Sequence, residues 1–151
     1  MKSILLACAL TVAALAANAE SVATGNLNYS ISQANGEVVL TLINKTPDVP
    51  ATLESVGLLF PGTGDGVHSP RKINRTLDTK TEIALGGVDA FANLVSPGID
   101  LRSWKPFASD RIPNCRAAEC ETKPFAVKLS LKYSNTVSQE LLLGGFVQYS
   151  R

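Results

Sequence analysis

The chain has 151 residues, with 14 basic and 13 acidic side chains, a formal net charge of +1 and 45% hydrophobic residues. A protein that binds nucleic acid non-specifically needs an excess of positive charge gathered on one face, and this composition does not supply it. A polybasic segment that would hold the chain to an anionic membrane is also missing from the sequence. The composition therefore argues against nucleic-acid and membrane-surface binding.

The first 19 residues have the order of a secretory signal peptide. Lys2 is a short positive region, residues 4–16 form an apolar run, and Ala17 and Ala19 form a small-residue cleavage site. The apolar run is too short to span a membrane stably, and no second one follows, so no integral membrane segment is expected. We expect residues 1–19 to be removed and residues 20–151 to form one domain that is periplasmic or secreted.

A lipoprotein signal is the alternative interpretation of the same segment. Leu5, Leu6 and Ala7 precede Cys8 in the manner of a lipobox, which would make Cys8 a lipidated N-terminus. That interpretation leaves only residues 3–6 as the apolar region, which is shorter than the roughly 7–15 residues of a signal. Removal of Cys8 with the signal peptide is therefore favoured.

Two cysteines, Cys115 and Cys120, remain in the exported domain. Disulfides form and persist outside the cytoplasm, and a four-residue spacer is long enough to close if the loop turns. A redox pair would usually show Cys-x-x-Cys spacing. A zinc site needs three or four ligands, and the only histidine of the chain, His68, is distant in sequence. The sequence thus predicts a structural disulfide that fixes the shape of a loop.

The first predicted elements are a hairpin and a third strand. Residues 27–32 alternate between apolar and polar, residues 37–43 are rich in β-branched side chains, and Asn35-Gly36 lies between them. This combination strongly indicates a β-hairpin. After a Pro-containing turn at 45–50, residues 52–60 are typical of another strand. Its buried face is expected to be Val56, Leu58 and Phe60.

The middle of the chain gives weaker signals. Residues 61–72 are rich in glycine and proline and are predicted to be a long surface loop, followed by a strand centred on 81–85. Asp89 is expected to be the N-cap of a short helix that ends before Pro97. The buried face of this helix is expected to be Phe91, Leu94 and Val95. The segment from Trp104 to Lys123 is predicted to be irregular.

The end of the chain predicts a second hairpin. Residues 125–133 and 137–149 both alternate between apolar and polar side chains around a turn at 134–136. Gly144-Gly145 is expected to be a bulge or bend in the last strand. Leu142 and Phe146 are expected to point away from the buried face.

These elements predict an all-β fold. Six to seven strands, each buried on one face, cannot stand as an open sheet, so the expected fold is an antiparallel two-sheet Ig-like β-sandwich. One short helix near 89–95 would complete it. The pattern broadly resembles bacterial Ig-like sandwiches, but the inter-sheet disulfide and buried Trp of antibody-type domains are missing.

Catalysis has one candidate centre, His68, beside Asp65 and Ser69. Groups so close in sequence rarely face one another as a catalytic relay, and no nucleophile-elbow motif surrounds them. The glycines of this segment do not open a phosphate-binding helix, and Asp65 alone cannot hold Ca²⁺. We therefore expect no enzyme activity, no cofactor and no metal site, and the interpretation of His68 as a solvated loop residue is favoured.

Two segments are candidates for binding. Residues 71–80 carry Arg71, Lys72, Arg75 and Lys80 against one acidic side chain, which suits an acidic partner or a charged, solvated edge strand. Trp104 follows Arg102, and these two residue types are enriched at binding hot spots. A Trp at this place equally suits a cap on the core.

The sequence as a whole favours an exported, non-catalytic binding module that recognises another envelope or secreted protein. The expected binding residues are Asp65, His68, Arg71, Lys72, Arg75, Arg102 and Trp104. Three alternatives stay open: a subunit or accessory of a surface appendage assembled by β-strand addition, an inhibitor of a hydrolase that uses the loop 113–120, and a small hydrolase that uses His68. The oligomeric state does not follow from the sequence.

Overall fold

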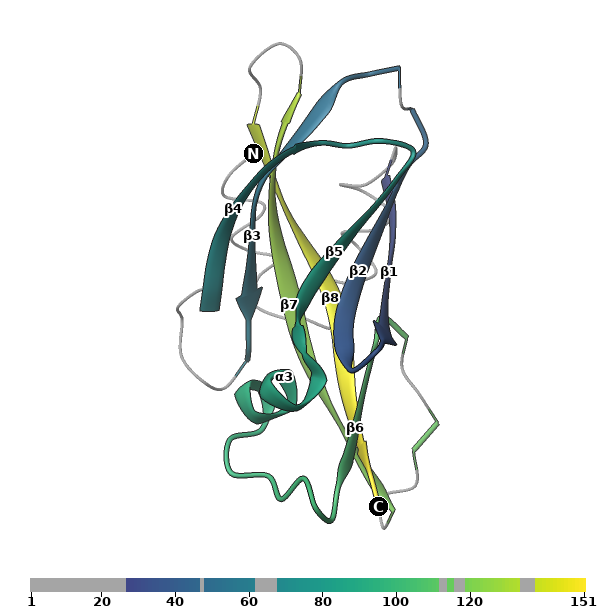
Figure 1. Cartoon of the computed structure of the whole chain (residues 1–151), viewed down its shortest axis with the longest axis vertical. Helices are drawn as coiled ribbons and strands as arrows, with labels where there is room; N and C mark the ends of the chain where they lie inside the picture. The colour runs from purple at the N-terminus through teal and green to yellow at the C-terminus, as the bar shows by residue number, and fades with distance from the viewer. Residues whose placement is uncertain (1–26, 47, 62–67, 112–113, 116–118, 134–137) are drawn as a thin grey trace.

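The computed structural model describes residues 27–151 apart from 47, 62–67, 112–113, 116–118 and 134–137. The described residues form two antiparallel sheets that pack face to face, as expected, with one short helix at an end (Figure 1). The sheet orders are β1-β2-β5 and β4-β3-β7-β8-β6. The elements are β1 (Leu27–Ala34), β2 (Glu37–Asn44), β3 (Ala51–Leu59), β4 (His68–Thr76), β5 (Lys80–Gly87), α3 (Val88–Val95), β6 (Lys105–Ser109), β7 (Cys120–Tyr133) and β8 (Ser138–Ser150).

The β1–β2 hairpin is confirmed. Its two turn residues, Asn35 and Gly36, have φ angles of 53° and 77°. Positive φ at both central residues is the type I′ geometry, whose twist matches that of the flanking strands. The two strands then pair without interruption from Ala34 opposite Glu37 to the far end.

The β7–β8 hairpin is also confirmed, but the bulge expected at Gly144-Gly145 is wrong. The two strands pair without a register shift along their whole length. Gly145 lies opposite Phe125, and a Cβ atom on Gly145 would lie 2.5 Å from the Phe125 ring and 2.9 Å from Ile31 Cδ1. The glycine therefore makes room for an aromatic ring between the sheets and leaves the strand regular.

Two edge strands correct the expected loops. Residues 68–72, expected within the loop 61–72, belong to β4, and the segment expected to be irregular contains β6 and the beginning of β7 at Cys120. Both β4 and β6 are outer strands of the five-stranded sheet. Edge strands tolerate the proline and charges that weaken a strand signal, such as Pro70 and Pro106. Residues 62–67 of the expected loop lie outside the described residues.

The core lies between the sheets and is closed at one end by α3. Phe91 of the helix makes edge-to-face contacts with Phe60 and Phe125, with ring centroids 5.7 and 4.7 Å apart. Because Phe91 lies between these rings, the buried face of the helix takes Phe91, Ala92 and Val95. The expected burial of Leu94 is therefore wrong, and that side chain is 36% exposed.

The beginning of α3 also differs from the expectation. Its N-cap is Gly87, and Asp89 lies in the first helical turn. Because the first turn leaves backbone N–H groups without helical partners, a carboxylate is favourable there even when it does not cap the helix. The helix itself begins at Val88 and ends at Val95, as the pattern predicted to within one residue.

The disulfide between Cys115 and Cys120 is confirmed, with Cα atoms 5.7 Å apart. The loop it closes is tied to the last strand, because Gln148 Nε2 donates to the Asn114 carbonyl at 2.9 Å. The backbone N–H of Arg151 donates to the backbone carbonyl of Glu119 at 3.1 Å. A disulfide of this kind is typical of an oxidising compartment outside the cytoplasm.

In the part of the chain that the structure describes, no helix is both long and apolar enough to cross a membrane.

Candidate binding surfaces

Three cations of the predicted basic segment, Arg71, Lys72 and Arg75, lie on β4, an edge strand of the five-stranded sheet. The fourth, Lys80, begins β5, an edge strand of the other sheet. Arg71 and Arg75 pair with Val56 and Leu53 of β3, whose side chains are buried, so both arginines leave β4 on its inner side. Arg71 Nη2 donates to the Ala84 carbonyl at 2.6 Å, and Arg75 Nη1 donates to the backbone carbonyl of Glu82 at 3.4 Å. The two arginines thus link the free edges of the two sheets.

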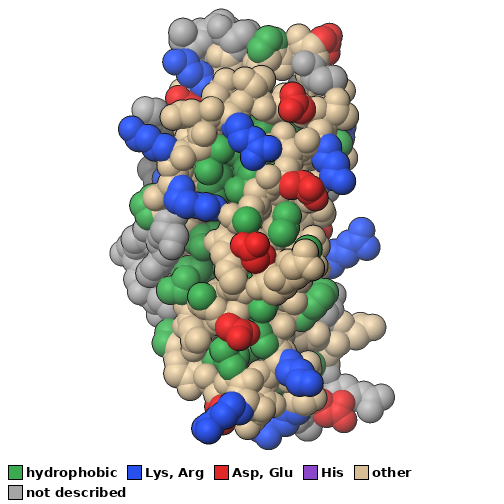
Figure 2. All heavy atoms as spheres, in the orientation of Figure 1, with side chains coloured by type: hydrophobic (Ala, Val, Ile, Leu, Met, Phe, Trp, Pro, Cys, Tyr) green, Lys and Arg blue, Asp and Glu red, His purple; other side chains and the backbone are tan. Residues whose placement is uncertain are grey.

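We call Arg71, Lys72 and Arg75 the β4 cationic edge. All three are exposed, and none has a carboxylate within 4.0 Å among the described residues. Figure 2 shows Lys and Arg side chains on the upper left of the molecule, where β4 lies. A guanidinium has five N–H donors in a rigid fork, so each arginine keeps donors free after bonding to β5. This edge presents positive charge that the described protein does not neutralise.

The other residues predicted at this site are only partly located. The backbone of His68 begins β4 opposite Leu58, and Asp65 lies outside the described residues. The expectation that Asp65, His68 and Ser69 form no catalytic relay therefore stays a prediction. Over the described ranges, no three His, Cys, Asp or Glu side chains are grouped in a way that could hold a metal ion.

Trp104 and Arg102 lie in another part of the molecule, in the segment between α3 and β6 (Figure 1). Trp104 is half-buried against the core, and the guanidinium of Arg151 lies 4.4 Å above its ring. Arg102 pairs with Asp100 at 3.2 Å and is 94% exposed. Hydrogen bonds from the backbone and then the side chain of Arg102 lower the pKa of Asp100. Trp104 therefore packs against the core, and the structure does not bring it to β4.

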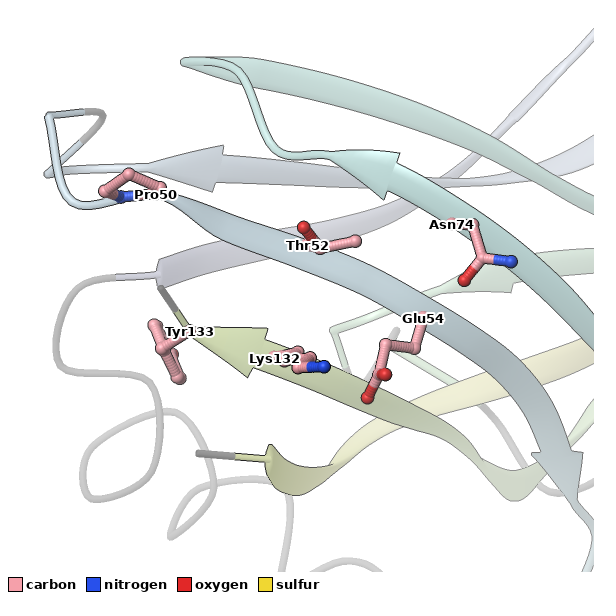
Figure 3. A pocket seen from close by; sticks show the side chains of 6 residues that line it. All are labelled: Pro50, Thr52, Glu54, Asn74, Lys132 and Tyr133. Atoms are coloured by element: carbon pink, nitrogen blue, oxygen red, sulfur yellow. The ribbon is translucent and has the colours of Figure 1, made fainter. Parts of the chain in front are cut away.

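A pocket that the sequence did not predict lies on the outer face of the five-stranded sheet (Figure 3). Its volume is about 400 Å³. The residues come from β3 and the residue before it, from β4 and from the end of β7. Because they are far apart in the chain, no motif of neighbouring residues predicts the pocket. They are Pro50, Thr52, Glu54, Asn74, Lys132 and Tyr133.

Two strand irregularities meet at this pocket. Against β7, Leu53 pairs with Leu131 and Ser55 with Ser130, so Glu54 is an extra residue in β3. The pairing with β4 also shifts there, but on that side β4 has the extra residue, since 73 and 74 lie opposite Glu54 alone. On β4, Asn74 has a φ angle of 50°, a left-handed conformation that Asn tolerates better than most residues. A bulge turns its extra residue out of the alternation, and such bulges are enriched beside functional sites. Here Glu54, the residue at the bulge, lines the pocket together with Thr52 of the same strand (Figure 3).

The opposite side of the sandwich, where β1 approaches β6, is closed by side chains. Asp110 Oδ1 accepts a hydrogen bond from the backbone N–H of Ile31 at 2.9 Å. Gln33 Oε1 accepts one from the N–H of Ala108 at 2.6 Å. An incoming strand would need these N–H groups free, because strand addition uses the backbone hydrogen bonds of an open edge.

The fold and these surfaces define a class of protein: a two-sheet β-sandwich with one disulfide, a cationic edge and a polar pocket. Comparisons with protein-family models, curated proteins and solved structures found no match. A sandwich of this architecture hosts many unrelated functions, so the function must be argued from the surfaces themselves.

Proposed function

We propose that this protein is an exported, non-catalytic binding module that recognises an acidic surface of another envelope or secreted protein through the β4 cationic edge. The signal-like N-terminus supports export to the periplasm or the cell exterior. The disulfide agrees with an oxidising compartment.

The observation that carries the proposal is the unneutralised charge of β4. Its three cations lie on one strand, whereas the two ion pairs found among the described residues, Arg102–Asp100 and Lys128–Glu140, lie elsewhere. Arg71 and Arg75 are each held by a bond to β5, so they lose less side-chain freedom when a partner binds than unrestrained arginines would. Charged surfaces of this kind steer a partner and fix its orientation.

Assembly by strand addition is less well supported. The β1 and β6 edges have N–H groups that are already bonded to Asp110 and Gln33. The β4 edge carries Pro70, which lacks an N–H, and is interrupted by two register shifts against β3. These features are typical of edges that resist further strand pairing.

The test is capture of the partner from the envelope fraction and culture fluid of the native host, with Lys72→Glu as the variant. Lys72 pairs with Ser55 and makes no described bond to β5, so its reversal changes the charge without loosening the sheets. We expect partner binding to weaken by about fivefold or more, since like charges at an interface are costly. Binding should also fall as salt is raised.

Lys105→Glu is the matched control, because Lys105 is exposed at the beginning of the other edge strand of the same sheet. The control should retain the partner. A partner that binds Lys72→Glu as tightly as the unmodified protein would overturn the proposed site.

A further inference from the structure

We propose that the pocket on the outer face of the five-stranded sheet binds a small zwitterion, with an ammonium and a carboxylate on neighbouring atoms as in a free amino acid. Glu54 would hold the ammonium and Lys132 the carboxylate. This second site is separate from the β4 cationic edge and does not depend on it.

The carboxylate of Glu54 is held through one oxygen, and the other oxygen has no partner among the described residues. Its Oε1 accepts hydrogen bonds from Ser130 Oγ at 3.3 Å and Ser138 Oγ at 3.4 Å. Neither bond uses Oε2, and hydroxyl donors leave the negative charge of the group intact. Glu54 is half-buried, so an ammonium that reaches it meets a carboxylate less hydrated than one at the open surface.

Lys132 contributes the opposite charge. It is exposed on β7, pairs with Thr52 across the sheet, and has no carboxylate oxygen within 4.0 Å among the described residues. Glu54 and Lys132 therefore line one pocket without neutralising each other. Figure 3 shows the two side chains leaving adjacent strands on the same side of the sheet.

The same sheet face also carries a lysine and a glutamate that do form an ion pair with each other. Lys128 lies four residues before Lys132 on β7, and it forms an ion pair with Glu140 of β8 at 3.1 Å. Glu54 differs from Glu140 because it lies at the bulge of β3 against β7 and has no cation within 4.0 Å among the described residues. The pocket is thus a place where two charges stay available to a third molecule.

The remaining walls suit a small polar ligand. Thr52 and Asn74 supply neutral hydrogen-bonding groups, and Pro50 and the ring of Tyr133 supply apolar surface. Burial raises the pKa of Tyr133, which keeps its phenol neutral. A volume of about 400 Å³ lies near the lower end of ligand pockets, and a few placed polar groups on an apolar wall are what fix a ligand's orientation.

The first experiment is an NMR titration of the protein with the standard free amino acids, one at a time, at millimolar concentration. The strongest binder is then compared with its amide, which keeps only the ammonium, and with its N-acetyl form, which keeps only the carboxylate. D-glucose serves as a neutral polar probe. We expect the zwitterion to shift the pocket resonances. Each single-charge form should bind at least about tenfold more weakly, as expected for loss of one charged hydrogen bond.

The variants assign the two charges. With Glu54→Gln, the zwitterion should bind no more tightly than its N-acetyl form. With Lys132→Gln, it should bind no more tightly than its amide. Lys128→Gln and Glu140→Gln are matched controls on the same face and should change neither. Thermal unfolding confirms that each variant is folded.

Three results would overturn the proposal: no free amino acid shifts the pocket resonances, glucose binds more tightly than any of them, or the single-charge forms bind as well as the zwitterion. The two proposals can fail separately. Lys72→Glu should leave the small-molecule titration unchanged, and Glu54→Gln should leave protein capture unchanged.

Discussion

At the scale of single residues, one glycine decides how closely the two sheets pack. Gly145 of β8 lies opposite Phe125, and both residues are buried. Phe125 in turn contacts Phe91 of the helix, so the position of one ring links β7, β8 and α3. A side chain at 145 would occupy the space that this ring fills.

Gly145→Ala should therefore destabilise the protein. The added Cβ would lie 2.5 Å from Phe125 Cζ and 2.9 Å from Ile31 Cδ1, which are distances that require the ring or the strand to move. Overpacking of this kind costs about 1–3 kcal/mol. Urea unfolding followed by fluorescence or circular dichroism measures the change in the free energy of unfolding.

Gly87→Ala is the control for this measurement. Gly87 has a φ angle of −64°, and a Cβ there would meet only the Gly36 carbonyl at 4.0 Å. We expect a change within about 1 kcal/mol, because the lost N-cap preference for glycine and the reduced entropy of the unfolded chain oppose each other. Equal effects of the two substitutions would contradict the packing argument.

At the scale of elements, α3 is attached to the sandwich by rings and by hydrogen bonds. The backbone N–H of Val88 donates to the Gly36 carbonyl in the β1–β2 turn at 2.8 Å. The hydroxyl of Tyr149 on β8 donates to the Ala92 carbonyl at 2.6 Å and is buried. The backbone N–H of Ser96 donates to the same carbonyl at 2.9 Å. Burial, and then the nearby charge of Glu121, raises the pKa of Tyr149 to about 12.

Tyr149→Phe should reduce the free energy of unfolding by about 1 kcal/mol near neutral pH, the net contribution of one hydrogen bond. The loss stays modest because Ser96 still satisfies the Ala92 carbonyl. Chemical denaturation of both proteins under the same conditions gives the difference.

This difference should also depend on pH. The folded pKa of about 12 lies above the ordinary value of 10.0, so the folded state favours the neutral phenol. The resulting stabilisation is fully present below pH 10 and is lost as pH rises from 10 towards 12. Denaturation measured from pH 8 to 12 should show the advantage of the unmodified protein shrinking in that window. A constant difference would argue against a buried, protonated Tyr149.

At the scale of the whole molecule, side chains close both sides of the sandwich. Arg71 and Arg75 join β4 to β5 on one side, and Asp110 and Gln33 bond to edge N–H groups where β1 approaches β6 on the other. Exposed edges invite pairing between molecules, and natural proteins use devices of this kind against it. The bonds of Arg71 and Arg75 also restrain the β4 cationic edge, the binding surface that we propose.

Removal of two of these side chains should promote self-association. In the double variant Gln33→Ala with Asp110→Ala, the N–H groups of Ala108 and Ile31 lose their acceptors and become available to another chain. Sedimentation velocity over a range of concentrations should show more association than the unmodified protein at the same concentration. Asp110→Asn is the control, because its amide oxygen can still accept the Ile31 N–H. Association unchanged in the double variant would contradict the protective role of these bonds.

Much of the fold was predictable because its signals are local. The alternation in β1, β3, β7 and β8, the Asn35-Gly36 turn and the spacing of the two cysteines each depend on residues close in sequence. The edge strands β4 and β6 were missed for the same reason, since their charges and prolines carry no local strand signal. The core position of Trp104 was left open between two interpretations.

The sequence by itself determined the all-β class, the two hairpins, the disulfide partners and the basic character of residues 71–80, because each follows from chemistry within a few residues. The tertiary structure alone decided that Gly145 accommodates a ring, that Arg71 and Arg75 bond to β5, and that Glu54 and Lys132 share a pocket. Such juxtapositions depend on strand order and on a bulge that shifts register. Because sheet neighbours can lie far apart in the chain, their side chains meet only once the strands have packed.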